Sequence, residues 1–89
     1  MGNLYLIDKP FGENGLALAQ DDPEAQAVLI QDGVYLDMRE MIACGHRVYA
    51  VSQDVEKRGI RERILPDVKL IDYGELVDLI VAHKVINFA

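Results

Sequence analysis

Two side chains that could support covalent chemistry lie close together in residues 43–59, ACGHRVYAVSQDVEKRG. Cys44 is the only cysteine of the chain, and His46 follows it by two positions. A nearby imidazole can favour the thiolate, which is the form of cysteine that acts as a nucleophile. The alternative is a semi-buried structural cysteine that fills a turn. The two interpretations differ in where Cys44 must lie within the fold.

Aspartates form a second set of reactive side chains, because several of them follow predicted strands. They are Asp8, Asp32, Asp54 and Asp72. Paired carboxylates can carry out acid–base chemistry or bind a hard cation. We expect Asp54 and Asp72 instead to cap helices, since aspartate is a common helix cap. His46, His83 and Cys44 are too scattered for a zinc site, so we predict no metal and no cofactor.

Short apolar runs mark the strands that must position these residues. They span residues 3–7, 27–30, 47–51 and 68–71. Three of the runs are nearly continuous rather than alternating, which is typical of strands covered on both faces in a parallel sheet. The tail KVINFA, residues 84–89, could add a short edge strand or dock on a neighbouring molecule.

Helical patterns lie between these runs, beginning with a weak one over residues 14–21. A second helix is predicted to end at Gly45, which can take a left-handed conformation. Its apolar face would comprise Val34, Tyr35, Met38, Met41 and Ile42. A third, short helix is expected to be capped by Ser52 and to end at Gly59.

The last helix has the clearest start signal, because Asp72 can cap it while Glu75 reaches back in a capping box. Its predicted apolar face comprises Tyr73, Leu76, Val77 and Ile80. Alternation of strands and helices at this spacing predicts right-handed βαβ crossovers. The chain is therefore expected to form one small layered α/β domain, residues 1–89, with a mainly parallel sheet of four to five strands.

The net charge of −6 argues against direct binding to nucleic acid, because phosphate backbones repel such a chain. A basic cluster stands out within the acidic chain: Lys57, Arg58, Arg61 and Arg63. It is either a solvated helical face or a local docking patch for an acidic partner. No apolar run reaches the length of a membrane span, and the N-terminus lacks the pattern of a signal peptide. A free thiol suits a reducing compartment, so we expect a cytoplasmic protein without membrane attachment.

The predicted topology places Cys44 at the less promising edge of the sheet. Ligands of open parallel sheets bind beyond the carboxyl ends of the strands. Cys44 precedes the strand at 47–51, and a five-residue strand spans roughly 16 Å. The structural interpretation of Cys44 is therefore favoured over the reactive one.

Three blocks of the sequence, AVLIQDGVY, RVYAVSQDVEKRGI and VKLIDYGELVDLIVAHK, occur in order over roughly residues 27–84. Together they closely resemble the DsrH/TusB family of sulfur-relay proteins. The resemblance implies a DsrE/DsrF-like α/β fold and a hetero-oligomer with DsrE/TusD-like and DsrF/TusC-like subunits. Such a complex passes persulfide sulfur from TusA-like donors to TusE/DsrC-like acceptors. The pathway would be either tRNA processing, by 2-thiolation of the wobble uridine, or dissimilatory sulfur metabolism.

The resemblance also gives Val51 a meaning. In the related DsrE/TusD subunit, the sulfur-accepting cysteine lies eight residues before the glycine of an Arg-Gly pair. The matching position here, counted back from Gly59, is Val51, which cannot hold a persulfide. Some family members carry a cysteine near the end of the first helix, where this chain reads LALAQDD. The resemblance therefore implies no catalytic residue here, and Cys44 is kept as a minority candidate.

These observations predict a non-catalytic subunit of a sulfur-relay complex. The expected interface residues are Gln31, Asp32, Tyr35 and Tyr73, although the two tyrosines could instead pack in the core. One alternative is a self-standing homo-oligomeric sulfur carrier that uses Cys44. Another is a small ligand-binding α/β module that uses the aspartates at the carboxyl edge.

Overall fold

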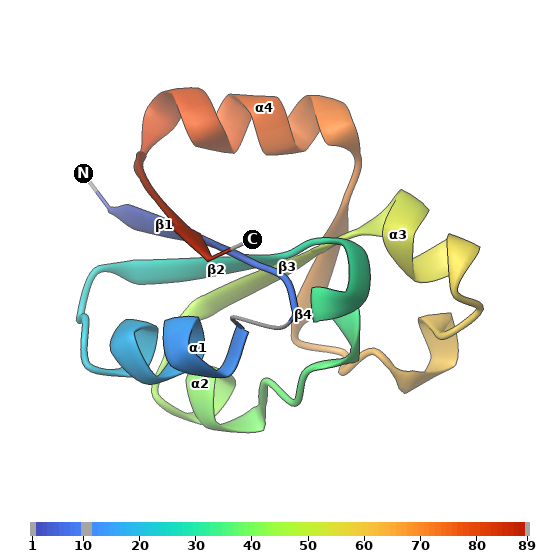
Figure 1. Ribbon diagram of the computed structural model, residues 1–89, viewed down its shortest axis with the longest axis horizontal. Coiled ribbons are helices and arrows are strands. Elements are labelled where there is room, and N and C mark those ends of the chain that lie inside the picture. The colour runs from blue at the N-terminus through green and yellow to red at the C-terminus, as the bar shows by residue number, and fades with distance from the viewer. Residues whose placement is uncertain (1, 10–11, 89) are drawn as a thin grey trace.

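The computed structural model describes residues 2–9 and 12–88. Its centre is a five-stranded sheet in which every neighbouring pair is parallel, in the order β4-β3-β2-β1-β5 (Figure 1). The strands are β1 (Asn3–Ile7), β2 (Ala25–Leu29), β3 (Arg47–Val51), β4 (Val68–Ile71) and β5 (Lys84–Phe88). The prediction of an α/β fold with a mainly parallel sheet is thereby confirmed. The tail does form an edge strand, and Ala89 lies outside the described residues.

The two faces of the sheet are covered unequally. In Figure 1, α4 (Tyr73–Ala82) lies by itself over one face, while α1 (Gly12–Gln20) and α2 (Arg39–Ala43) lie over the other. The remaining α-helix, α3 (Ser52–Lys57), follows β3 directly at the carboxyl edge. The central strands are buried on both sides, which explains why their sequences are continuous apolar runs.

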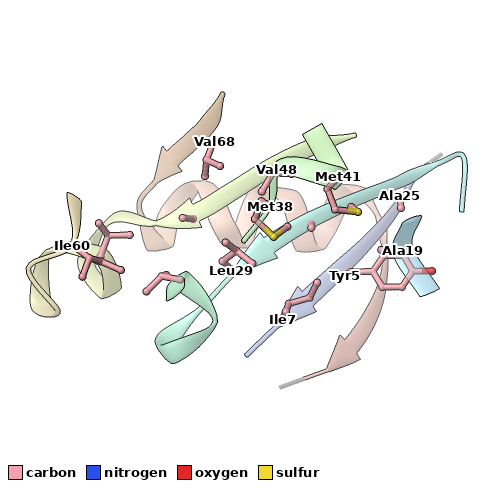
Figure 2. Close-up of a cluster of buried hydrophobic side chains, with 14 residues drawn as sticks. Tyr5, Ile7, Ala19, Ala25, Leu29, Met38, Met41, Val48, Ile60 and Val68 are labelled. Atoms are coloured by element: carbon pink, nitrogen blue, oxygen red, sulfur yellow. The ribbon is translucent and has the colours of Figure 1, made fainter. Parts of the chain in front are cut away.

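The larger part of the core lies on the face of the sheet that carries α1 and α2 (Figure 1), and Figure 2 shows its buried side chains. Its buried residues include Tyr5, Ile7, Ala19, Ala25, Leu29, Met38, Met41, Val48, Ile60 and Val68. Helix α1 packs closely because Gly15 has no side chain: a Cβ there would lie 2.8 Å from the ring of Phe88. The Phe88 ring in turn stacks on Tyr5, with ring centroids 6.2 Å apart. The glycine that makes residues 14–21 a weak helical pattern is thus what lets α1 approach β5.

The continuous helix predicted over residues 34–42 is wrong. The chain forms a short 3₁₀ segment, η1 (Gln31–Tyr35), and only then α2. Leu36 is extended between them, with φ −72° and ψ 145°, and Asp37 accepts the Arg39 N–H at 3.1 Å as α2 begins. Met38 and Met41 are nevertheless buried. The apolar spacing correctly indicated buried residues. The 3₁₀ segment and the short helix α2 bury them as well as one continuous helix would.

Helix α4 begins with the predicted capping box. The Asp72 carboxylate accepts the Glu75 N–H at 2.8 Å, and the Glu75 side chain accepts the Asp72 N–H at 3.5 Å. Leu76 and Leu79 of this helix pack on a second core cluster. That cluster comprises Leu4, Val28, Tyr49, Val51 and Ile71.

The predicted apolar face of α4 is only partly the buried one. Leu76 packs on the sheet, but Tyr73, Val77 and Ile80 are 52%, 56% and 37% exposed, and Val81 is 81% exposed. The helix has two apolar flanks, since Leu76 and Leu79 lie on one and the exposed residues lie on another. The spacing of apolar residues does not show which of two apolar flanks packs on the sheet. The sequence therefore did not identify the exposed flank. We call Tyr73, Val77, Ile80 and Val81 the exposed flank of α4.

Two glycines end helices as expected, while one predicted cap is wrong. Gly45 and Gly59 have φ values of +85° and +63°, the left-handed conformation that closes α2 and α3. Ser52 does not cap α3: Val51 holds the N-cap position, and the Ser52 hydroxyl donates to the Gln53 side chain at 3.2 Å. None of the helices within the described residues is long and apolar enough to cross a membrane.

Candidate functional site

A buried carboxylate organises the carboxyl edge of the sheet. Asp54 in α3 is 7% exposed, the only buried charged side chain among the residues that the structure describes. One carboxylate oxygen accepts the backbone N–H of Gln31 at 2.9 Å. The other accepts the hydroxyl of Tyr73 at 3.4 Å. The ends of β2 and β4 are thereby tied to α3 through a single side chain.

The prediction that Asp54 caps a helix is therefore wrong. Its side chain accepts from the loop after β2 rather than from the first turn of α3, whose N-cap is Val51. From the sequence alone, an aspartate that caps a helix cannot be distinguished from one that accepts a hydrogen bond from a distant loop. Asp72 does cap α4, as expected.

Arg58 completes the arrangement around Asp54. Its Nε donates to Asp32 at 2.9 Å, and one terminal nitrogen donates to the Asp54 backbone carbonyl at 3.1 Å. The same nitrogen lies 3.7 Å from the Asp54 carboxylate. The hydrogen bond to Asp32 raises the pKa of Arg58, opposed by partial desolvation of the guanidinium. Arg58 is thus held between two carboxylates on different segments.

A cavity of about 320 Å³ opens beside this network. Its lining residues are Ile30, Gln31, Asp54, Lys57, Arg58, Tyr73 and Leu76. Apolar walls and a few fixed polar groups are common in sites that receive a ligand or a partner side chain.

The aspartates of the carboxyl edge do not assemble into a cation site. The Asp8 carboxylate accepts the N–H groups of Lys9 and Gly33, at 2.7 and 3.1 Å. Asp32 pairs with Arg58, and Asp72 caps its helix. Across residues 2–9 and 12–88, no three acidic, histidine or cysteine side chains are placed to hold a metal ion together.

Val51 lies where the resemblance places the sulfur-accepting cysteine of the paralogue, at the carboxyl end of β3. Its side chain is 0% exposed and belongs to the core cluster beneath α4. Neighbouring strands contribute Val28 and Ile71 to the same cluster. This strand end is closed by aliphatic packing.

Cys44 lies at the opposite edge of the sheet, as expected, but it is exposed rather than semi-buried. It holds the C-cap position of α2, where its backbone N–H donates to the Glu40 carbonyl at 3.0 Å. The ring of His46 lies 3.0 Å from the Ala25 carbonyl, measured from Nδ1. The imidazole that could have supported a thiolate is therefore engaged with the backbone of β2.

The expected interface residues are all exposed, so the alternative of two core tyrosines is wrong. Tyr35 is 45% exposed, and its ring lies 5.5 Å from the Lys9 ammonium. Gln31, Asp32 and Tyr73 converge on the Asp54 network described above. Their role as an interface stays a prediction.

The basic cluster proves to be divided between the end of α3, with Arg58 as its C-cap, and the 3₁₀ segment η2 (Arg61–Arg63). Arg58 belongs to the Asp54 network, and Arg61 pairs with Glu56 at 3.0 Å. Sequence reasoning missed the structural role of the pair Asp54 and Arg58. Their spacing of four residues on a helix was the available signal.

The parallel sheet and its covering helices make this chain a small α/β protein, and a solved structure shares this fold. The crystal structure of the ychN protein from E. coli superposes with a TM-score of 0.78 over 99% of each chain. At 19% sequence identity, this likeness concerns the fold alone.

The family model described as DsrH like protein matches residues 13–86, and the chain belongs to this DsrH/TusB family. Protein TusB of Buchnera aphidicola subsp. Baizongia pistaciae is 31% identical over 86 residues, 89% of this chain and 90% of that relative. Protein TusB of Photorhabdus laumondii is 36% identical over 62 residues, 63% of this chain. That match and the one to Protein TusB of Pectobacterium parmentieri each span only 65% of the relative's length. The resemblance seen in the sequence blocks is confirmed.

Proposed function

We propose that this chain is a non-catalytic subunit of a cytoplasmic sulfur-relay complex. Its direct partners are a DsrE/TusD-like and a DsrF/TusC-like subunit. Through them it serves a TusA-like donor and a TusE/DsrC-like acceptor, in tRNA thiolation or in dissimilatory sulfur metabolism. Membership of the DsrH/TusB family supports the general assignment.

Val51 is the observation that carries the non-catalytic role. An aliphatic side chain with no exposed surface fills the strand end that corresponds to the paralogue's thiol. A persulfide needs a sulfur atom that a carrier protein can reach. This subunit therefore contributes shape and contacts to the complex rather than a sulfur-carrying site.

The exposed flank of α4 supports association with other subunits. Tyr73, Val77, Ile80 and Val81 put apolar surface next to one another on a single helix. Contiguous apolar patches on a small protein commonly mark a site of protein–protein contact. An all-parallel sheet is normally covered on both faces. Here α4 is the only helix that covers one of the two faces.

The experiment is sulfur transfer with the assembled proteins. This chain would be co-expressed with the DsrE/TusD-like and DsrF/TusC-like proteins of the same cell, purified through a tag on this chain, and incubated with a sulfur donor. We expect all three chains to co-purify, and intact-mass measurement to find added sulfur on the DsrE/TusD-like chain only. Purification of this chain alone would contradict the proposal, as would sulfur added mainly to this chain.

Cys44 favours one second candidate function, because its exposure makes the thiol accessible. In this alternative the chain forms a homo-oligomer and carries sulfur on Cys44 itself. Incubation of the isolated chain with a sulfur donor would then add the mass of a sulfur atom, and Cys44→Ser would abolish the addition. No added mass in the unmodified chain would eliminate this alternative.

A further inference from the structure

We propose that the chain binds a small apolar molecule carrying a carboxylate in a second cavity, which lies between the segment that leads into α2 and the segment that joins β3 to β4. The volume of this cavity is about 300 Å³, at the lower end of the range found for small-molecule sites. We call it the η2 cavity. Among the described residues, it shares no lining residue with the cavity beside Asp54. The proposal goes beyond the sulfur-relay role, because it concerns a ligand of the chain by itself.

The η2 cavity exists because the helices next to it are short. Helix α2 has five residues, α3 has six, and η2 adds three more before β4. A five-residue helix is about 8 Å long, whereas a five-residue strand spans about 16 Å. These helices are therefore too short to cover the strands over their whole length. The connecting segments cover the remainder, and the cavity is left between them.

Buried residues from four segments form the floor of the η2 cavity. They come from β2, the N-cap of α2, the N-cap of η2 and the first position of β4: Leu29, Met38, Ile60 and Val68 (Figure 2). Partly buried residues that pack on the same core form the walls: Leu36, Ile64 and Leu65. An apolar molecule in the cavity would contact apolar side chains on several sides. It would also remove the exposed part of the walls from water, which favours binding.

Arg63 supplies an unpaired cation at the rim of the cavity. Its side chain is exposed, and within the described residues it takes part in no ion pair and no side-chain hydrogen bond. The other two charged lining residues neutralise each other, since Arg39 Nε donates to Asp37 at 3.0 Å and a terminal nitrogen lies 2.6 Å from the same carboxylate. Arg61, two residues earlier, is paired with Glu56 at 3.0 Å. The rim therefore carries one uncompensated positive charge.

Lys9 places a second positive charge close to the cavity. Its ammonium lies 5.5 Å from the centre of the Tyr35 ring, and Tyr35 is a lining residue. The carboxylate of the neighbouring Asp8 accepts the N–H groups of Lys9 and Gly33 at 2.7 and 3.1 Å. In a chain with a net charge of −6, positive charge is thus concentrated beside an apolar cavity. A local field of this sign favours an anion.

These features define the class of ligand. A carboxylate matches the planar guanidinium of Arg63, which can donate two parallel hydrogen bonds to the two carboxylate oxygens. The remainder of the molecule must be apolar, because the floor and the walls consist of apolar side chains. A cationic ligand would be repelled by Arg63 and Lys9. The volume suits a compact body such as two fused aromatic rings.

The test is a titration of the full chain with naphthoate, a rigid aromatic carboxylate, followed through the methyl NMR signals of the protein. We expect the signals of Leu36, Ile64 and Leu65 to shift most. The shifts should saturate with a dissociation constant of about 1 mM, which is typical for a ligand of this size. Naphthalenemethanol, the neutral analogue, should bind about fivefold more weakly, because it lacks the charge that Arg63 attracts.

Arg63→Gln separates the contribution of the charge from that of the apolar cavity. It should weaken naphthoate binding about fivefold and leave naphthalenemethanol binding unchanged, since only the charged ligand interacts with the guanidinium. The matched control is Arg61→Gln, which removes an equal charge from the same 3₁₀ segment at a position outside the lining of the cavity. It should leave both dissociation constants unchanged, because exposed charges at a distance are screened by salt.

The proposal would be overturned if the wall residues showed no shift at about ten times the expected dissociation constant. Largest shifts on the exposed flank of α4 would also overturn it, because the probe would then be binding to that surface. An equal loss of affinity in Arg61→Gln and Arg63→Gln would show that overall charge, rather than a site at the rim, attracts the ligand. The titration uses no sulfur donor and no partner subunit, so its failure would leave the sulfur-relay proposal standing.

Discussion

Cys44 and Val51 lie at opposite ends of the segment that forms β3, and they differ fully in accessibility. Cys44 is exposed at the C-cap of α2, whereas Val51 has 0% of its surface exposed at the carboxyl edge. The only thiol of the chain and the position that the sequence resemblance assigns to the paralogue's thiol are thus separated by the length of a strand. A sulfur atom on Cys44 would lie at the opposite edge of the sheet from the Asp54 network.

This separation predicts how thiols at the two positions react. Cys44 should react rapidly with a thiol-labelling reagent in the folded chain. A Val51→Cys variant in a Cys44→Ser background should react at least about tenfold more slowly, because opening of the core would be needed. Both chains should label at similar rates in denaturant, which is the control. Equal rates in the folded chains would contradict the burial of position 51.

Removing the cap of α4 should lower the free energy of unfolding by about 1 kcal/mol. Asp72→Ala leaves the Glu75 N–H without its acceptor at 2.8 Å. Asp72→Asn should retain most of the stability, because asparagine is also a good cap. Urea unfolding measures both, and Asp67→Ala, at an exposed turn position, should change the value by less than about 0.5 kcal/mol. A loss for Asp67→Ala as large as that for Asp72→Ala would argue against the capping explanation.

The exposed flank of α4 predicts a substitution that affects assembly but not folding. Val81→Lys, at a position 81% exposed, should leave the free energy of unfolding of the isolated chain within about 0.5 kcal/mol. It should abolish co-purification of the partner subunits, because a charge would be buried without a counter-charge. Asp78→Lys, on the same helix but outside the apolar flank, is the matched control. Undiminished assembly of Val81→Lys would exclude this flank from the interface.

The lowered pKa of Asp22 predicts part of the pH dependence of the free energy of unfolding. Its pKa is lowered from the ordinary 3.8, mainly by the side-chain N–H of Asn3 at 2.7 Å and then by the Glu24 N–H at 2.9 Å. A carboxylate whose pKa is lower in the folded state stabilises the fold above its unfolded pKa. That contribution is lost as the pH falls below about 4 and passes through the folded pKa.

Unfolding in urea between about pH 5 and about pH 3 measures this effect. Asp22→Asn should flatten the decline in stability over that range, because the side chain no longer titrates. Asp21→Asn, at the exposed neighbouring position, should leave the decline as steep as in the original chain. If the two variants gave the same profile, the contacts of Asp22 with Asn3 and Glu24 would not be responsible.

The sequence predicted the strands well because apolar runs of this kind have few alternatives. The runs at 3–7, 47–51 and 68–71 match β1, β3 and β4 to the residue, and the capping box at Asp72 was found from spacing alone. The helix predicted over residues 34–42 failed because a 3₁₀ turn and a short helix can bury the same methionines. Local sequence patterns therefore predict which residues are buried more reliably than they predict the type of secondary structure in which those residues lie.

The site was harder to predict because its central contacts join distant segments. Asp54 meets the Gln31 N–H and the Tyr73 hydroxyl only after β2, β3 and β4 have aligned their carboxyl ends. No spacing rule relates these positions. The exposed flank of α4 could not be predicted either. Val81 is an apolar residue like the leucines that pack on the sheet, so its residue type does not indicate exposure.

The parallel pairing of β5 with β1 also determines when the fold can be completed. Asn3 pairs with Lys84 and Ile7 with Phe88, so the outer side of the first strand stays open until the last strand has been synthesised. Contacts between residues so far apart in the chain raise the contact order and slow folding. On the ribosome, β1 would therefore remain an unpaired strand edge that could join another chain. Nascent copies are most vulnerable to aggregation during that interval, when the Phe88 ring has not yet stacked on Tyr5.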